Sequence, residues 1–470
     1  MKMLCQAITL ALGAVGFVAT AHAATYVVTA NGNSFDNHLA SRIEAAGGTI
    51  TARLPQIGVA IVESDHSDFA TRAARIPGVH SAVNDIVLQF ELPEGKETIE
   101  ASFANPPSSG DNDAFFDLQW GHAAIDVAGA WNAGHRGAGA TVAVLDSGLY
   151  CGHVDIAPNL IGGASFVPSE PSYCNTSGST HGTHVAGTIL AADNGIGTIG
   201  VAPLSKLLAV KVLSAATGSG SFGGIIQGIV HAADQGADVI NMSLGVAGGL
   251  PVNGKGSNAV RDLINATARA TRYARSQNAL VVVAAGNDGR DLDKDSSTRI
   301  CDAAGADCFN MNLLAFPAEL PGVLTISALA PEGWAKTFDN ANLDLLASYS
   351  SYGVTGISFS APGGDYRYPG NELCSRTLGN GQTIVNYCWA FDMVMSTTRS
   401  PGFYGWSAGT SMAAPHVSGV AALIIGKNGG SMAPAEVERI LRASADDLGK
   451  AGKDAVHGFG RVNAAKAVAY

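Results

Sequence analysis

The amino-acid sequence predicts an α/β fold, in which one large parallel sheet carries helices on both faces and a small α+β unit precedes it. From residue 113 onward, short and nearly continuous apolar runs alternate with stretches of helical periodicity. That alternation is typical of a parallel sheet buried on both faces. A hydrophobic content of 47% and a charged content of 14% make a large core possible in this chain of 470 residues.

Residues 1–23 are typical of a secretory signal peptide. Lys2 supplies a positive charge, residues 7–20 are mostly apolar, and Ala21-His22-Ala23 matches an A-x-A cleavage site. The apolar stretch is short for a membrane span, although a retained N-terminal anchor stays open as the alternative. Because no second apolar run of spanning length follows, we expect an exported protein with no membrane partner.

Residues 24–91 form a small domain, and residues 92–112 form a linker. The pattern in the small domain alternates as βαββαβ, which is the order of a ferredoxin-like sandwich. The linker is rich in Glu, Pro, Ser and Gly and has no apolar period, so we expect it to be exposed and open to proteolysis. A small domain, a cleavable linker and a large domain are the layout of a zymogen. The expected elements of the small domain are strand 26–30, helix 35–46, extended segment 49–62 with a turn near 55–56, helix 67–75 and extended segment 79–90.

Residues 113–470 form the large domain, and its elements follow from apolar runs and helical periodicity. The expected strands are 141–145, 207–213, 238–243, 280–284, 323–328 and 357–361. The expected helices are 122–133, 181–192, 223–235, 259–276, 411–426, 434–443 and 462–468. Two further stretches, 290–313 and 364–403, have the character of surface insertions.

Six cysteines remain once Cys5 leaves with the signal, and an even number in an exported protein predicts three disulfides. The sequence does not fix the pairing, but neighbouring cysteines favour Cys151–Cys174, Cys301–Cys308 and Cys374–Cys388. The formal net charge of −11 argues against nucleic acid as a partner. We expect a monomer.

Three short motifs carry candidate chemistry. Asp146-Ser147-Gly148 follows a strand, at the sheet edge where functional groups gather. His181 opens a helix in His181-Gly182-Thr183-His184, in which we interpret His184 as a core residue. Ser411 begins a buried helix, where free N–H groups and the helix dipole favour developing negative charge. A carboxylate, a base and a nucleophile are what acyl transfer through serine requires.

These motifs, with Gly409-Thr410-Ser411-Met412-Ala413-Ala414-Pro415-His416, resemble the three signatures of subtilisin-like serine proteases (subtilases) in the same chain order. The resemblance runs from about Asp113 to the C-terminus. It implies a subtilisin-like parallel sheet, with Ser411 as nucleophile, His181 as general base and Asp146 as the orienting carboxylate. It also implies that residues 24–91 are an inhibitor-like propeptide, which acts as a chaperone and blocks the active site until it is cut.

The same resemblance assigns binding residues. Asn287 would donate to the oxyanion together with the backbone N–H of Ser411. Substrate would add as a strand beside Ser243, Leu244 and Gly245, with Ala284, Ala285 and Gly286 forming a pocket wall. A calcium loop is implied, to which carboxylates and loop oxygens would contribute. Its implied ligands are Asp113, Asp155, Ala192, Asn194, Ile196 and Thr198.

The sequence therefore predicts a secreted serine endopeptidase that is made as a self-processed zymogen. An inactive subtilase-like protein that binds peptides or inhibits proteases is the alternative, although all four catalytic positions are filled. A carboxyl protease of the sedolisin type would need Glu in place of His181. The natural substrate, the mature N-terminus and the number of calcium sites are not predicted.

Overall fold

The computed structural model describes residues 23–93, 98–100, 110–254, 257–294, 298–301, 308–337 and 340–470. The expected signal peptide lies outside these residues, except for Ala23. The chain divides into two compact units. The first contains the residues up to Asp85 together with segments within 251–263 and 295–313. The second contains Ile86–Leu250, Ile264–Lys294 and Leu314–Tyr470.

The first unit contains the βαββαβ arrangement expected from the sequence. Its four antiparallel strands follow the order β2-β3-β1-β4, and its helices pack on them through Ile43 and Phe69, both fully buried. Asp36 caps the first helix by accepting from the Leu39 N–H at 2.7 Å. The elements are β1 (Ala24–Ala30), α1 (Asn37–Ala45), β2 (Thr49–Leu54), β3 (Val59–Ser64), α2 (Phe69–Ala73) and β4 (Val79–Asn84).

The extended segment expected over 79–90 is not one strand. It divides after β4, and β5 (Val87–Gln89) pairs instead with β10 (Ser219–Ser221) of the second unit. Asp85 ends the first unit and Ile86 begins the second. The segment that follows the small sheet is therefore part of the compact unit that contains the candidate site.

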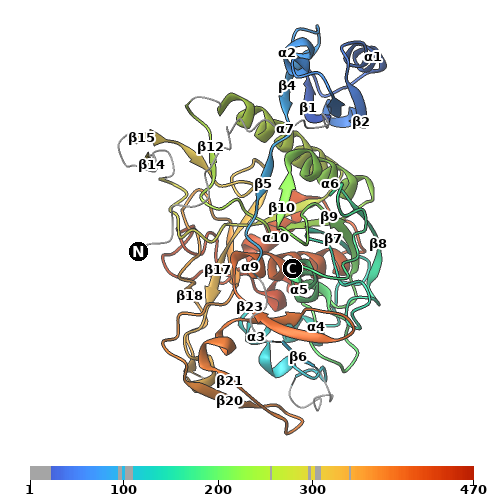
Figure 1. The fold of residues 1–470 in the computed structure, drawn as a ribbon. Coiled ribbons are helices and arrows are strands. Elements are labelled where there is room, and N and C mark those ends of the chain that lie inside the picture. Colours follow the sequence, from blue (N-terminus) through green and yellow to red (C-terminus); the bar gives the residue numbers. More distant parts are fainter. Residues whose placement is uncertain are drawn as a thin grey trace. The chain divides into compact units, whose positions relative to one another are not determined.

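The second unit is built on an eight-stranded sheet with the order β18-β17-β13-β11-β7-β9-β8, in which β19 also pairs with β17. Figure 1 labels β7, β8, β9, β17 and β18 of this sheet. Within this sheet, the described pairings between strands are parallel, apart from the short antiparallel pair of β17 and β18. The strands are β7 (Thr141–Asp146), β8 (Leu160–Ser165), β9 (Lys206–Lys211), β11 (Val239–Met242), β13 (Leu280–Ala284), β17 (Leu324–Ala330), β18 (Leu345–Leu346) and β19 (Phe359–Pro362).

Helices cover both faces of this sheet, as predicted. Side chains alternate between the faces of a strand. Val142 and Val144 belong to the core that contains α5 and α9, whereas Leu145 and Val210 face Gly228 of α6 on the other side. The helices are α5 (His181–Leu190), α6 (Phe222–Asp234), α7 (Ser257–Ser276), α9 (Thr410–Lys427), α10 (Pro434–Ser444) and α11 (Ala464–Ala469).

Helix α9 lies in the middle of the second unit (Figure 1), and all its residues from Thr410 to Ile425 are buried. It packs against α5 and against β11, β13, β17 and β19. A helix that is apolar all round is expected to be a core helix. This burial explains why the sequence from 417 to 425 is apolar or small at every position.

The single helix expected over 122–133 is wrong. The structure forms α3 (Trp120–Ala124) and α4 (Val127–Asn132), separated at Asp126. Asp126 has φ 51°, in the left-handed region, and its carboxylate caps α4 by accepting from the Gly129 N–H at 3.2 Å. Aspartate tolerates this conformation better than most residues do, and it favours helix caps over helix interiors.

The expectation that 364–403 is a surface insertion holds for only part of the segment. The hairpin of β20 (Leu373–Thr377) and β21 (Thr383–Tyr387) carries exposed Leu373 and Val385. In contrast, β22 (Val394–Thr397) is buried and pairs with β23 (Phe403–Ser407), against α5. The sequence did not distinguish the exposed hairpin from the buried one, because Ser, Thr and Gly interrupt the apolar pattern of β22 and β23.

The structure contains the Cys151–Cys174 and Cys374–Cys388 disulfides that neighbouring cysteines predict. The side chains of Cys301 and Cys308 lie outside the described parts of the chain, although their backbones face each other across the β14–β15 hairpin (Thr298–Cys301 and Cys308–Met311). Within the ranges described above, no helix combines the length and apolar character needed to cross a bilayer.

Candidate active site

Asp146 is the last residue of β7, at the carboxyl edge of the parallel sheet. Its side chain is almost fully buried, with 1% exposure. The Ser147 N–H donates to Asp146 Oδ1 at 2.7 Å, and the Val212 N–H donates to its backbone carbonyl at 2.9 Å. The carboxylate is therefore held by the turn that leaves the strand, and Asp146 lies at the strand end where the sequence places it.

His181 is the first residue of α5, and its ring meets Asp146 directly. His181 Nδ1 lies 2.8 Å from Asp146 Oδ1 and 3.0 Å from Oδ2. Because a carboxylate only accepts, the proton of the neutral ring sits on Nδ1 and leaves Nε2 basic. Gly182 permits this approach, since a Cβ there would come within 2.3 Å of the Gly148 carbonyl oxygen.

His184 has a different role, as the sequence indicates. Its Nε2 lies 3.1 Å from the Val394 carbonyl oxygen and 3.2 Å from that of Gly405, which ties α5 to the β22–β23 hairpin. Burial lowers the pKa of His184 to about 3, so the ring stays neutral. Of the two histidines in the motif, only His181 faces the carboxylate.

Ser411 is the second residue of α9, whose N-cap is Gly409. Its hydroxyl donates to the Ser243 carbonyl at 3.2 Å, and the Ser243 hydroxyl donates to the Ser411 carbonyl at 2.8 Å. Asn241 continues this network through a 2.9 Å bond to Ser243 Oγ. Ser243 follows β11, which runs parallel to β7, so the Ser411 hydroxyl and the Asp146–His181 pair lie at the same carboxyl edge of the sheet.

Asn287 follows β13 and is oriented by Thr410, the residue before Ser411. Its Oδ1 accepts from both the backbone N–H and the hydroxyl of Thr410, each at 2.9 Å. The same hydroxyl accepts from the Gly286 N–H at 3.1 Å. With Oδ1 occupied in this way, the amide nitrogen is turned away from Thr410, where it lies 3.4 Å from Glu91 Oε2.

The chain itself occupies the strand position expected for a peptide. Leu88 lies opposite Gly220 in an antiparallel pair, and the Phe90 N–H donates to the Gly218 carbonyl at 3.2 Å. On the other side, Phe90 forms a bridge with Val246, and the Glu91 N–H lies 3.4 Å from the Gly245 carbonyl. Residues 87–91 thus lie between β10 and the segment at Gly245 and Val246 that follows β11.

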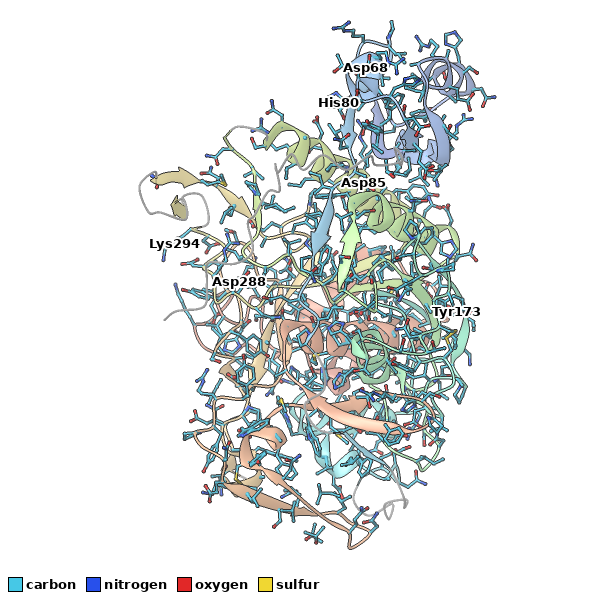
Figure 2. All side chains as sticks on the ribbon, in the orientation of Figure 1. Asp68, His80, Asp85, Tyr173, Asp288 and Lys294 are labelled. Atoms are coloured by element: carbon cyan, nitrogen blue, oxygen red, sulfur yellow. A yellow bond between two sulfur atoms is a disulfide. The ribbon has the colours of Figure 1, made fainter. Side chains whose placement is uncertain are left out.

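A small hollow lies beside Ser411 and is lined by Gly245, Ala284, Gly286, Asn287 and Glu91. Of the other residues expected to bind substrate, Ser243 contacts Ser411, whereas Leu244 and Ala285 are buried, the latter against Leu292 and Ile357. Asp288, labelled in Figure 2, stands exposed at the rim. Burial and the nearby Asp288 charge raise the pKa of Glu91.

Buried carboxylates gather around the predicted calcium loop. Asp113 and Asp155 have no exposed surface, and they accept hydrogen bonds from Ile196 N and Asn194 Nδ2 at 3.1 and 3.0 Å. Burial raises the pKa of Asp155 to about 7, and burial together with the neighbouring Asp111 raises that of Asp113 to about 9. A nearby cation would favour the ionised form of both carboxylates, and a donor set of oxygen atoms fits a hard divalent ion.

The structure adds two acidic residues to the set expected from the sequence. Carboxylate oxygens of Asp111, Asp113 and Asp193 lie within 4.8 Å of one another and could hold a metal ion. Arg136 approaches the same group, at 2.7 Å from Asp193 and 3.9 Å from Asp111. Asp111 lies in the predicted linker, where no motif marks it.

The profile of the subtilase family matches residues 137–460. The chain is 35% identical to Subtilisin Savinase from Lederbergia lenta over 349 residues, which is 74% of this chain and 97% of that protein. It is 34% identical to Subtilisin E from Bacillus subtilis (strain 168) over 332 residues, covering 71% of this chain and 67% of the relative.

Solved structures share the fold. Fervidolysin from Fervidobacterium pennivorans, a keratinolytic enzyme related to subtilisin, superimposes with a TM-score of 0.64 and 24% identity, over 96% of this chain and 61% of the longer protein. The epidermin leader peptide processing serine protease from Staphylococcus aureus gives a TM-score of 0.66 and 20% identity, over 95% of this chain and 98% of that one. At these identities the likeness concerns the fold alone.

Proposed function

The chain belongs to the subtilase family of serine-type endopeptidases, and on that premise we propose that it cuts proteins with a triad of Asp146, His181 and Ser411. The observation that carries the proposal is the buried Asp146–His181 pair, at the same sheet edge as Ser411 on the first turn of α9. An inactive peptide-binding or inhibitory relative would have no need for a base oriented by a buried carboxylate.

The residues of the site divide the chemical tasks of this mechanism. His181 Nε2 takes the proton of Ser411 as its oxygen attacks the substrate carbonyl, and Asp146 stabilises the imidazolium that results. The amide of Asn287 and the Ser411 N–H donate to the oxyanion. His181 then returns the proton to the leaving amine, and water hydrolyses the acyl-enzyme by the same route.

We propose further that the chain is secreted as a zymogen with a signal peptide at 1–23, a propeptide at 24–91, a linker at 92–112 and a catalytic domain at 113–470. The extended segment 87–91 supports this, because it lies where a peptide would pair and its Glu91 reaches the Asn287 amide. The propeptide then acts as the enzyme's own inhibitor and folding template. We expect the mature enzyme to be a monomer that acts on protein substrates and not on nucleic acid.

Secretion of the full chain from a bacterial host tests both proposals. We expect casein hydrolysis that a serine-directed fluorophosphonate abolishes by labelling Ser411. N-terminal sequencing of the active product should place its first residue within 92–112. A labelled and active product that still begins near residue 24 would refute the zymogen proposal but leave the protease proposal intact. A folded product that neither hydrolyses casein nor reacts with the fluorophosphonate would refute both the protease proposal and the zymogen proposal.

We propose Ca²⁺ as the ion at the acidic loop, with a structural role. The side chains of Asp113, Asp155 and Asn194 and the carbonyls of Ala192, Ile196 and Thr198 would hold it, with Asp111 and Asp193 nearby. Binding to the folded state alone stabilises it by about 2.7 kcal/mol when the ion is at 100 times its Kd.

EDTA is therefore expected to lower the Tm of the purified enzyme by about 5 °C, and added Ca²⁺ should restore it. Asp155→Asn should remove most of this response. Asp126→Asn, an exposed helix cap that asparagine can also fill, should keep it. An equal Tm with and without EDTA would contradict the calcium proposal.

A further inference from the structure

A buried lysine behind Asp146 has no part in the mechanism above. Lys211 ends β9, and the parallel register places it beside Asp146 at the end of β7. Its side chain has no exposed surface. Lysine is rarely buried to this extent because removing an isolated ammonium group from water is costly, so its partners must compensate.

The Lys211 ammonium has three oxygen partners. It donates to the Ser147 carbonyl, to Asn175 Oδ1 at 3.0 Å, and to Glu170 Oε2 at 2.9 Å. An ammonium has three protons, so each has a partner. A Cβ added to Gly148 would approach Lys211 Nζ to 3.0 Å. The charge therefore packs directly beneath the turn that follows Asp146.

Glu170 provides the counter-charge and is itself firmly held. The Ala215 N–H donates to Glu170 Oε2 at 2.9 Å, and the Ser214 hydroxyl donates to Oε1. Although burial opposes the effect, these bonds and the one from Lys211 lower the pKa of Glu170 to about 2. The lowered pKa favours the ionised form of Glu170.

Asn175 joins the same assembly to the turn after Asp146. Its N–H donates to the Leu149 carbonyl at 2.6 Å, and its side chain donates to the Ser147 carbonyl at 3.0 Å. The preceding Cys174 is bonded to Cys151, next to Tyr173, which Figure 2 labels. The loop that holds Lys211 is thus fastened covalently to the segment that carries the carboxylate.

We propose that Lys211 is a positioning residue that acts on catalysis through Asp146. It fixes the carbonyl of Ser147, whose own N–H donates to Asp146 Oδ1 at 2.7 Å, so the orientation of the carboxylate depends on the ammonium. This inference rests on the proposed triad.

The charges give the proposal a second consequence. The ionisable groups that face Lys211 are Asp146 from β7 and Glu170 from the loop, and His184 beside the His181 ring is held neutral by burial. A cation near His181 disfavours its protonation, and an anion favours it. Removing Lys211 or Glu170 alone should therefore move the pKa of His181 in opposite directions.

The test is the pH profile of kcat/KM for the processed enzyme and its variants. Lys211→Met should lower kcat by about tenfold or more with little change in KM. A misplaced catalytic base slows the chemical step, whereas it takes no part in binding the substrate. Its acid limb should move up by about 0.5 pH unit, whereas that of Glu170→Gln should move down by a similar amount.

The double variant K211M/E170Q removes both charges and leaves no unpaired ion. Its acid limb should return to near the wild-type position while kcat stays low. Glu170→Gln keeps the Lys211 ammonium and its other two partners. This variant therefore tests the predicted shift of the acid limb even if the Lys211 variants do not fold and are not secreted. Wild-type kcat in folded Lys211→Met or K211M/E170Q, or an unmoved acid limb in Glu170→Gln, would overturn the proposal. An inactive wild-type enzyme would refute the triad instead.

Discussion

Ser411→Ala is expected to abolish proteolysis and to leave the secreted chain as an uncleaved precursor. The substitution removes the oxygen that would form the acyl-enzyme in the proposed mechanism, while Asp146 and His181 remain paired. In subtilisin, loss of the triad serine lowers kcat by about 10⁶-fold, and we carry that magnitude over from a family member. The two readouts are hydrolysis of a chromogenic peptide and the mass of the secreted protein.

Ser418→Ala is the matched control, because it makes the same change two turns further along α9. Ser418 Oγ donates to Asn241 Oδ1 at 2.8 Å in the core, so its loss should reduce stability by about 1–3 kcal/mol without preventing turnover. A processed and active Ser411→Ala protein would exclude Ser411 as the nucleophile. Equal inactivation of both variants would mean that the effect comes from the fold of the helix.

Much of the fold was predictable because its central strands are apolar on both faces. Short continuous apolar runs such as 280–284 are typical of buried strands between helices, and the structure confirms the parallel sheet. Strand β8 was missed because Gly162 and Gly163 weaken the apolar pattern at the sheet edge. The division at Asp126 was missed because it depends on one residue in the left-handed region.

In the candidate site, too, some residues are marked by local sequence motifs, whereas others are revealed only by tertiary contacts. Asp146, His181 and Ser411 each sit in a motif whose small neighbours serve close packing, so the sequence alone marks them as candidates. Lys211 carries no such signal, since a lysine at a strand end is ordinarily an exposed terminus. Lys211 is linked to the site only by its register opposite Asp146 and by its ion pair with Glu170, which comes from a distant loop.

Asn287→Ala is expected to lower kcat by about 10²–10³-fold with a much smaller change in KM, a magnitude again taken from subtilisin. The amide would contribute mainly when the carbonyl oxygen becomes negative, so its loss raises the barrier more than it weakens substrate binding. Steady-state kinetics on a peptide substrate measures both constants.

Alanine also removes the acceptor of the Thr410 N–H and hydroxyl. A second variant is therefore needed to distinguish loss of the oxyanion donor from loss of the contact that holds Thr410. Asn287→Asp keeps an oxygen facing Thr410 and replaces the donor with a negative charge. If the amide acts on the oxyanion, this variant should lose at least as much kcat as Asn287→Ala while its Tm stays near that of the wild type. Recovery of kcat in Asn287→Asp would show instead that Asn287 serves only to hold Thr410 and the start of α9.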